Sequence, residues 1–288
     1  DTIGVAAVVN ATVNGSKGTD TITTSGTITG SRTYGGADDD TININAGTVG
    51  LNSKFNGSKG ADQINVVANA NVTGASLYGG EGADVINVTG ANASTLYLSG
   101  DKGADKITVA ATATTGGSVF GGTGGDTISV GAAAATDTWA VDAGEGNDSV
   151  TLTGTSTDTV TFDRGDSVAA SAQTIAGATV AAGDTFVFAD GVDVMTGFAT
   201  TVDHVDVDMT VPAAVTDISA AAVTTVVAAT DLAFITGTWA GTTFTVAAAG
   251  ADQLWIAGGG GSQISNLTTS NTNIFIADNF NMVVGDFT

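Results

Sequence analysis

The sequence predicts an all-β chain that begins as a parallel β-solenoid of about 21 residues per coil and continues into a β-rich C-terminal portion. Three observations support this prediction. A glycine turn closed by an aspartate recurs at nearly constant spacing, each turn is followed by alternating apolar and polar residues, and the 288 residues include 41 glycines but a single proline. Such a composition favours an ordered array of tight turns over helices.

The glycine turn occurs seven times, as GSKGTDTIT, GGADDDTINI, GSKGADQINV, GGEGADVINV, GDKGADKITV, GGTGGDTISV and AGEGNDSVTL. The aspartates that close the turns are separated by 20, 22, 22, 21, 21 and 22 residues and are Asp20, Asp40, Asp62, Asp84, Asp105, Asp126 and Asp148. A period of this length indicates a solenoid, a propeller or a repeat array. The opening DTIGV matches DTISV at 126–130, so we expect the chain to begin inside a coil, with Asp1 at the position of a closing aspartate.

Each coil is predicted to consist of a strand, a loose turn, a second strand and the glycine turn. Short apolar stretches at 76–78 and 95–99 supply the second strand. Two strands of four to six residues with two turns need about 21 residues, whereas a propeller blade needs about 40. The alternation after the turn places Ile86 and Val88, and likewise Ile107 and Val109, on one face, which predicts an inner column of aliphatic side chains.

The period fades after about residue 155, so we predict a solenoid over residues 1–160 and a separate β-rich region over 161–288 that caps it and takes part in assembly. Residues 231–246, 252–258 and 271–280 alternate apolar and polar side chains between glycine and asparagine turns, as strands do. The alanine-rich residues 213–229 predict a short helix.

The charge and the cysteine content exclude several classes of function. The formal net charge of −22 repels nucleic acids and anionic membrane surfaces, and it requires cations to neutralise part of the carboxylates. The chain contains no cysteine, which excludes disulfides and thiolate metal sites. No apolar run reaches the roughly 18 residues that span a bilayer, so we expect no membrane insertion.

The turn Gly-Gly-x-Gly-x-Asp followed by x-apolar-x resembles the nonapeptide of the RTX (repeats-in-toxin) family, whose parallel β-rolls bind calcium between neighbouring coils. The resemblance covers residues 1 to about 155 and points to the S-layer-like, secreted structural type. RTX rolls carry the nonapeptide in both halves of a coil, whereas here one half carries it. The resemblance therefore implies one column of Ca²⁺ sites.

The chemistry of the turn agrees with this expectation, because glycines let backbone carbonyls converge and aspartate adds a hard anionic oxygen, and Ca²⁺ takes six to eight such oxygens. The alternative is that glycine and aspartate only build tight corners and Asx-turns. The first-ranked candidate ligands are Asp38, Asp40, Asp84, Asp126 and Asp148, followed by Asp20, Asp62 and Asp105 together with Gly80, Gly82, Gly122 and Gly124.

Lysines occupy the third position of alternate turns and lower the rank of those turns as ion sites. They are Lys17, Lys59 and Lys102. Each ammonium either replaces an ion in a salt-bridge ladder with the stacked aspartates or points to solvent. The sequence leaves both alternatives open.

Two C-terminal stretches carry a second resemblance. The segments DTFVF, DVMTGF and DHVDV, from residue 184 to 207, resemble the sequence that follows the roll in RTX exoproteins, although Gly197 stands where an aspartate is usual. The ending VVGDFT is similar to the uncleaved tails of type I secretion substrates. These similarities imply a secretion signal in residues 161–288 and a location outside the cell or on its surface.

The sequence predicts no catalytic site. His204 is the only histidine, and the tryptophans Trp139, Trp239 and Trp255 are expected either to pack in the core or to stack on sugars. We therefore expect a secreted calcium-binding structural protein that self-assembles into an extracellular surface layer or filament, with a cell-surface polysaccharide as a further partner. The alternatives are a calcium-stabilised adhesin or spacer module, and the non-catalytic roll of a carbohydrate-active enzyme.

Overall fold

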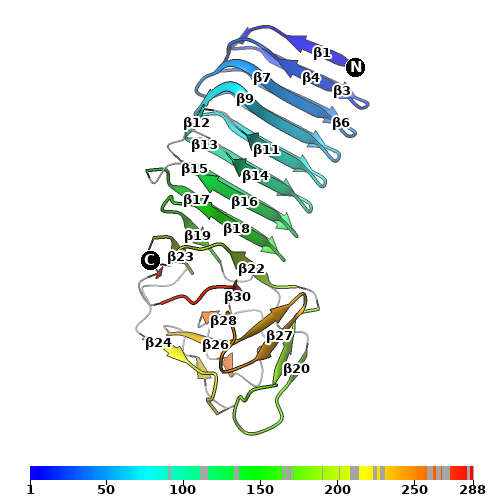
Figure 1. Ribbon diagram of the computed structural model, residues 1–288. Helices are drawn as coiled ribbons and strands as arrows, with labels where there is room; N and C mark the ends of the chain where they lie inside the picture. Colours follow the sequence, from blue (N-terminus) through cyan, green and yellow to red (C-terminus); the bar gives the residue numbers. More distant parts are fainter. Residues whose placement is uncertain are drawn as a thin grey trace. The chain divides into compact units, whose positions relative to one another are not determined.

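A computed structural model gives the structure of the protein and describes residues 1–288 except 90–91, 111–115, 133–135, 164–165, 167–169, 171, 190, 201, 208–213, 223–225, 228–230, 258–261, 264–266, 268–272, 284–285 and 288. The described residues are all-β with no helix, and they confirm a parallel β-solenoid of about 9 turns with roughly 21 residues per turn (Figure 1). No helix that could cross a membrane occurs among them.

The chain forms two compact units. Unit 1 comprises Asp1–Ala143 and Leu152–Thr159, and unit 2 comprises Gly144–Thr151 and Val160–Thr288. Strands β17 (Trp139–Gly146), β18 (Ser149–Gly154) and β19 (Thr159–Thr161) lie where the chain passes between the two units.

Unit 1 is built from two parallel sheets. Sheet A contains β1 (Thr2–Val5), β4 (Thr21–Thr24), β7 (Thr41–Val49), β9 (Gln63–Thr73), β11 (Val85–Thr89), β14 (Lys106–Ala110) and β16 (Thr127–Ala132), each paired with the equivalent strand of the next coil. Sheet B contains β3 (Thr12–Lys17), β6 (Arg32–Ala37), β8 (Lys54–Lys59), β10 (Ser76–Glu81), β13 (Leu96–Lys102) and β15 (Gly117–Gly124). The short strands β2 (Val8–Val9), β5 (Ile28–Thr29) and β12 (Asn92–Ser94) lie in the loose turns.

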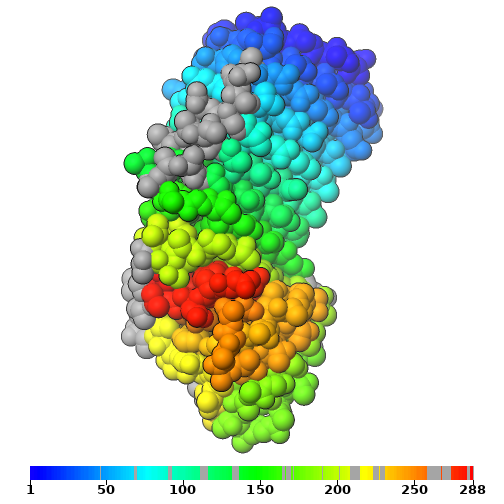
Figure 2. Space-filling model, viewed as in Figure 1, coloured from blue at the N-terminus to red at the C-terminus, as the bar shows by residue number. Residues whose placement is uncertain are grey.

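The core of unit 1 consists of columns of like side chains, because equivalent positions of successive coils lie in register. Sheet A contributes one column of isoleucines, which are Ile22, Ile42, Ile64, Ile86, Ile107 and Ile128. Its second column consists of the aliphatic residues Ile44, Val66, Val88, Val109 and Val130. Sheet B faces them with Phe55, Leu77, Leu98 and Val119. All are at most 1% exposed, which confirms the predicted inner column. Figure 2 shows successive coils of unit 1 as adjoining bands.

Unit 2 contains mixed parallel and antiparallel strands. They are β20 (Ala172–Thr174), β21 (Thr185–Val187), β22 (Asp193–Thr196), β23 (His204–Asp206), β24 (Ala214–Asp217), β25 (Val226–Val227), β26 (Asp231–Ala240), β27 (Thr243–Val246), β28 (Asp252–Ala257), β29 (Ser262–Gln263) and β30 (Asn273–Asp278). Strands β26, β28 and β30 form an antiparallel array, and β27 joins β26 to β21. Phe186, Phe244 and Ile256 lie in its buried core.

The short helix predicted over 213–229 is wrong for the described part of that stretch. Residues 214–217 form β24, which pairs in parallel with β26, and residues 226–227 form β25, which pairs with β29. The β-branched residues among the alanines favour an extended backbone when a sheet edge is available for pairing. Residues 218–222 are described and are not helical, whereas residues 213, 223–225 and 228–229 lie outside the described residues.

Candidate cation site in the glycine turns

The aspartates that close the glycine turns point into the solenoid and form one buried column. In unit 1 they are 1–2% exposed, and they are Asp20, Asp40, Asp62, Asp84, Asp105 and Asp126. From Asp40 to Asp126, the Oδ1 atom of each aspartate accepts a hydrogen bond from the backbone N–H of the aspartate one coil earlier, at 2.8 Å for Asp20 N to Asp40 and 2.7 Å for each later pair. The column therefore fastens each coil to the next.

The main chain of the same residues continues this connection. The carbonyl of Asp62 accepts a hydrogen bond from Val85 N, and that of Asp84 accepts one from Lys106 N, both at 2.8 Å. At the first rung the amino nitrogen of Asp1 lies 2.6 Å from Asp20 Oδ1, and Thr2 is in register with Thr21. Asp1 therefore occupies the position of a closing aspartate, as the sequence predicted.

The second carboxylate oxygen of each rung lies against the first glycine of its own turn. In the described part of the chain, Oδ2 of Asp40, Asp62, Asp84 and Asp105 is buried and has no hydrogen-bond partner. A Cβ atom on Gly79 would lie 2.4 Å from Asp84 Oδ2 and 2.6 Å from the Gly100 carbonyl oxygen of the next coil. The first glycine is thus required for space, and two oxygens approach it from one side.

Burial raises the pKa of these carboxyl groups. It raises the pKa of Asp84 to about 7 and that of Asp62, Asp105 and Asp126 to about 6, because desolvation disfavours the charged form. The pKa of Asp40 is raised for the same reason. The hydrogen bond from the preceding coil lowers each pKa in part. A proton or a cation is therefore favoured at the column near neutral pH.

The other predicted glycines allow the turns to stack closely. Gly80, Gly82, Gly122 and Gly124 have positive φ angles of 121°, 143°, 116° and 137°. A Cβ on Gly82 would lie 1.8 Å from the Gly60 carbonyl oxygen one coil earlier, and a Cβ on Gly124 would lie 1.8 Å from the Gly103 carbonyl oxygen. Hydrogen bonds between adjacent turns, such as Gly82 N to Lys102 O at 2.8 Å, close the stack further.

Asp38 lies apart from the column. It occupies the fourth position of its turn, where the six other turns have glycine, with a φ of 77°, and its side chain is exposed. Its Oδ2 accepts a hydrogen bond from Gly18 N at 3.0 Å. The neighbouring Asp39, which was not among the candidates, accepts one from Ala61 N at 2.8 Å. Both carboxylates satisfy exposed backbone donors of adjacent coils.

Unit 2 contains an equivalent pair of aspartates, one member of which the sequence analysis missed. Within unit 2 the backbone N–H of Asp148 donates to Asp193 Oδ1 at 2.9 Å, and both aspartates are buried. Ser149 of β18 is in register with Val194 of β22. The segment GVDVMT around Asp193 matches GADVIN around Asp84, so the motif could have been found, but its spacing of 45 residues concealed it.

The turn lysines Lys59 and Lys102 face solvent and pair with Glu81 rather than with the buried column. Lys59 Nζ lies 3.5 Å from one carboxylate oxygen of Glu81, and Lys102 Nζ lies 3.8 Å from the other. The lysine side chains are 70% exposed and the glutamate 55% exposed. These two lysines therefore follow the second alternative and point to solvent, and their ion pairs lie on the outside of the turns.

The donor chemistry of the column suits a hard cation, but the number of carboxylates is small. The rungs at Asp40, Asp84 and Asp105 each offer a buried carboxylate oxygen and a nearby glycine carbonyl of the next coil. Among the described residues no three histidine, aspartate or glutamate side chains gather where one ion could be held. Since Ca²⁺ takes six to eight oxygens, backbone carbonyls or water would have to complete a site here.

No protein-family model matches the chain, and no curated protein matches it in sequence.

Proposed function

We propose that the chain is a secreted, RTX-like structural protein that self-assembles into an extracellular surface layer or filament and performs no catalysis. The observation that supports this role best is the in-register stacking of whole coils, fastened by backbone ladders and by the aspartate column. Repeats that contact only their neighbours form a stiff element whose stability adds up along its length. Such an element suits a mechanical role.

Calcium is the cation that we propose for neutralising the column. The support for it is the set of buried carboxylate oxygens without hydrogen-bond partners in the described residues, together with the net charge of −22. Asp40, Asp62, Asp84 and Asp105 would hold the ion, with the glycine carbonyls that approach the same space. A divalent cation there would neutralise adjacent rungs and strengthen the contact between coils.

The test compares the full chain in millimolar CaCl₂ and in EGTA. Analytical ultracentrifugation and negative-stain electron microscopy should detect lattices or filaments with calcium and their dissolution on chelation, and calorimetry should detect a rise in melting temperature. Calcium titration without any heat or change in stability would contradict the cation proposal. A monomer in calcium at high concentration would contradict self-assembly.

A calcium-stabilised adhesin is the second candidate, and one observation favours it. The outer face of sheet B carries a group of aromatic side chains that the core does not use. An adhesin would remain monomeric in calcium and bind a glycan or a cell surface.

A further inference from the structure

Three aromatic rings from adjacent coils touch on the outer face of sheet B. The ring centroids of Tyr78 and Tyr97 are 5.5 Å apart, and those of Tyr97 and Phe120 are 5.0 Å apart with an interplanar angle of 30°. Lys54 Nζ lies 5.3 Å from the centroid of the Tyr78 ring. Tyr97 is 37% exposed. We call Tyr78, Tyr97 and Phe120 the aromatic platform.

The core does not require these rings. The inward face of the same three strands is already filled by Leu77, Leu98 and Val119, each 0% exposed. Polar residues can occupy the outward positions of these strands, as Ser76 and Ser118 do on the two strands that flank Tyr97, in register with it. Rings that pack side by side on a solvent-facing sheet form a flat apolar surface suited to a ligand.

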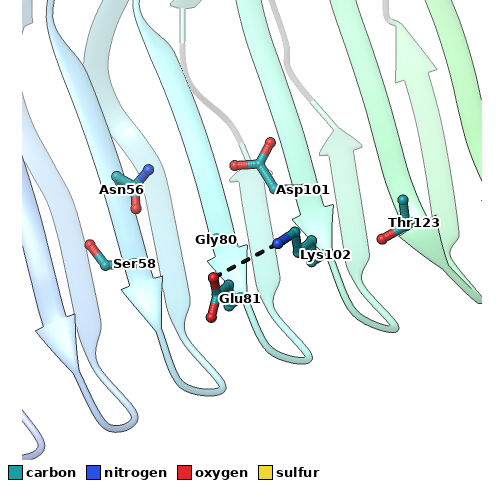
Figure 3. Close-up of a pocket in the computed structure, with 7 residues that line it drawn as sticks. All are labelled: Asn56, Ser58, Gly80, Glu81, Asp101, Lys102 and Thr123. Atoms are coloured by element: carbon teal, nitrogen blue, oxygen red, sulfur yellow. Dashed lines mark ion pairs between the residues drawn. The ribbon is translucent and has the colours of Figure 1, made fainter.

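A cavity of about 480 Å³ lies two residues further along the same strands, and its lining comes from β8, β10, β13 and β15 (Figure 3). Gly80 lacks a side chain and leaves room between Ser58 and Asp101, with which it is in register. Asp101 Oδ1 accepts a hydrogen bond from Ser99 Oγ at 2.5 Å, which fixes the carboxylate at the rim. Asn56 is in register with Tyr78 and adds an amide.

The charge of the surroundings selects the ligand. Burial raises the pKa of Tyr97, and Tyr78 and the carboxylates of Asp101 and Asp142 raise it further. The whole chain carries a net charge of −22, so an anionic polymer is repelled. Neutral hydroxyl groups, in contrast, donate charge-assisted hydrogen bonds to carboxylates.

We propose that the aromatic platform and the adjoining cavity bind a neutral polysaccharide. The apolar C–H face of a pyranose ring would pack on Tyr97, and the ring hydroxyls would donate to Asp101 and exchange hydrogen bonds with Asn56. The strands that carry these groups are about 4.8 Å apart, so several coils contribute to one extended binding surface. This site depends neither on the proposed calcium binding nor on self-assembly.

The test is affinity electrophoresis of the full chain in EGTA, through gels that contain soluble β-glucan, mannan or, as the anionic comparison, alginate. We expect at least one neutral polymer to retard the wild-type chain and alginate to leave its mobility unchanged. Tyr97→Ala should weaken retardation at least tenfold, and Asp101→Asn several-fold. Tyr34→Ala is the matched control, because Tyr34 is also a half-buried ring on sheet B but belongs neither to the aromatic platform nor to the lining of the cavity.

Circular dichroism and the melting temperature of each variant would verify that it is folded. Equal retardation of Tyr97→Ala and Tyr34→Ala would overturn the proposal, as would a wild-type chain that no neutral polymer retards. A wild-type chain that binds no polymer but loses self-association through Tyr97→Ala would assign the platform to a second copy of the chain instead. These results leave the calcium experiment unaffected.

Discussion

Replacing Asp84 by asparagine separates the two roles of the aspartate column. Asparagine keeps an oxygen that can accept the hydrogen bond from Asp62 N, which is 2.7 Å long in the wild-type protein. Its amide nitrogen replaces the buried oxygen that has no partner among the described residues, near the Gly100 carbonyl, which can accept a hydrogen bond. The variant therefore removes the charge while keeping the shape and the connection between coils.

The size of the stability change expected for Asp84→Asn follows from the pKa of Asp84. Burial raises it from 3.8 to about 7, so at pH 8 ionised Asp84 costs the folded state on the order of 4 kcal/mol. We expect Asp84→Asn to be more stable than the wild type at pH 8 without calcium by up to that amount. Asp84→Ala leaves the Asp62 N–H without its acceptor and should be less stable than Asp84→Asn by about 1–3 kcal/mol.

Urea unfolding monitored by circular dichroism at pH 8 in EGTA provides the measurement. Asp38→Asn is the control, because Asp38 is exposed and outside the column, and its stability should change little. In millimolar calcium, Asp84→Asn should gain less stability than the wild type if the column holds the ion. An Asp84→Asn variant that is less stable than the wild type at pH 8 in EGTA would refute the reasoning.

Three further predictions concern the same coils. Without calcium, the free energy of unfolding of the wild-type chain should fall as the pH rises from about 4 to 7 and then level off. The reason is that Asp62, Asp84 and Asp105 hold protons in the folded state that the unfolded chain has already released. An unfolding free energy that rises over this interval in urea titrations would contradict the burial argument. Gly79→Ala should cost about 1–3 kcal/mol or more through its clash with Asp84 and Gly100. Gly4→Ala should be nearly neutral in the same assay, because a Cβ at that position would meet no atom within 4 Å. Glu81→Gln breaks two exposed ion pairs and should change the unfolding free energy by at most about 1 kcal/mol, with the difference vanishing in 1 M salt.

The solenoid was predictable because its periodicity is recorded in the residue types. A constant spacing of 20 to 22 residues and the alternation around Ile86 and Val88 determine the number of residues per coil and the inward face. The direction of the aspartates was available in the same pattern. Asp84, Ile86 and Val88 occupy alternate positions, so the Asp84 carboxylate points to the same inward side as the two aliphatic side chains. The expectation of an ion site in the turn did not take this alternation into account.

Other features depend on tertiary contacts that the sequence does not display. The residues between Asp148 and Asp193 interrupt the spacing of the column, and only the pairing of β18 with β22 brings the two aspartates together. The rings of Tyr78 and Tyr97 occupy different positions of the repeat and meet diagonally across two coils. The predicted helix around residue 215 failed because pairing with β26 outweighed the helix propensity of alanine.

The aspartate column has a direction, and this constrains how such a chain can change its length. Each rung donates its N–H toward one end and receives, through its carboxylate, the N–H of the coil on the other side. A complete coil brings one donor and one acceptor, so duplication or deletion of a whole coil restores every hydrogen bond. A fraction of a coil leaves a buried charge and a buried N–H unmatched. Insertion or deletion of whole coils is therefore the change in length that the core tolerates, and the nearly constant spacing of 20 to 22 residues agrees with it.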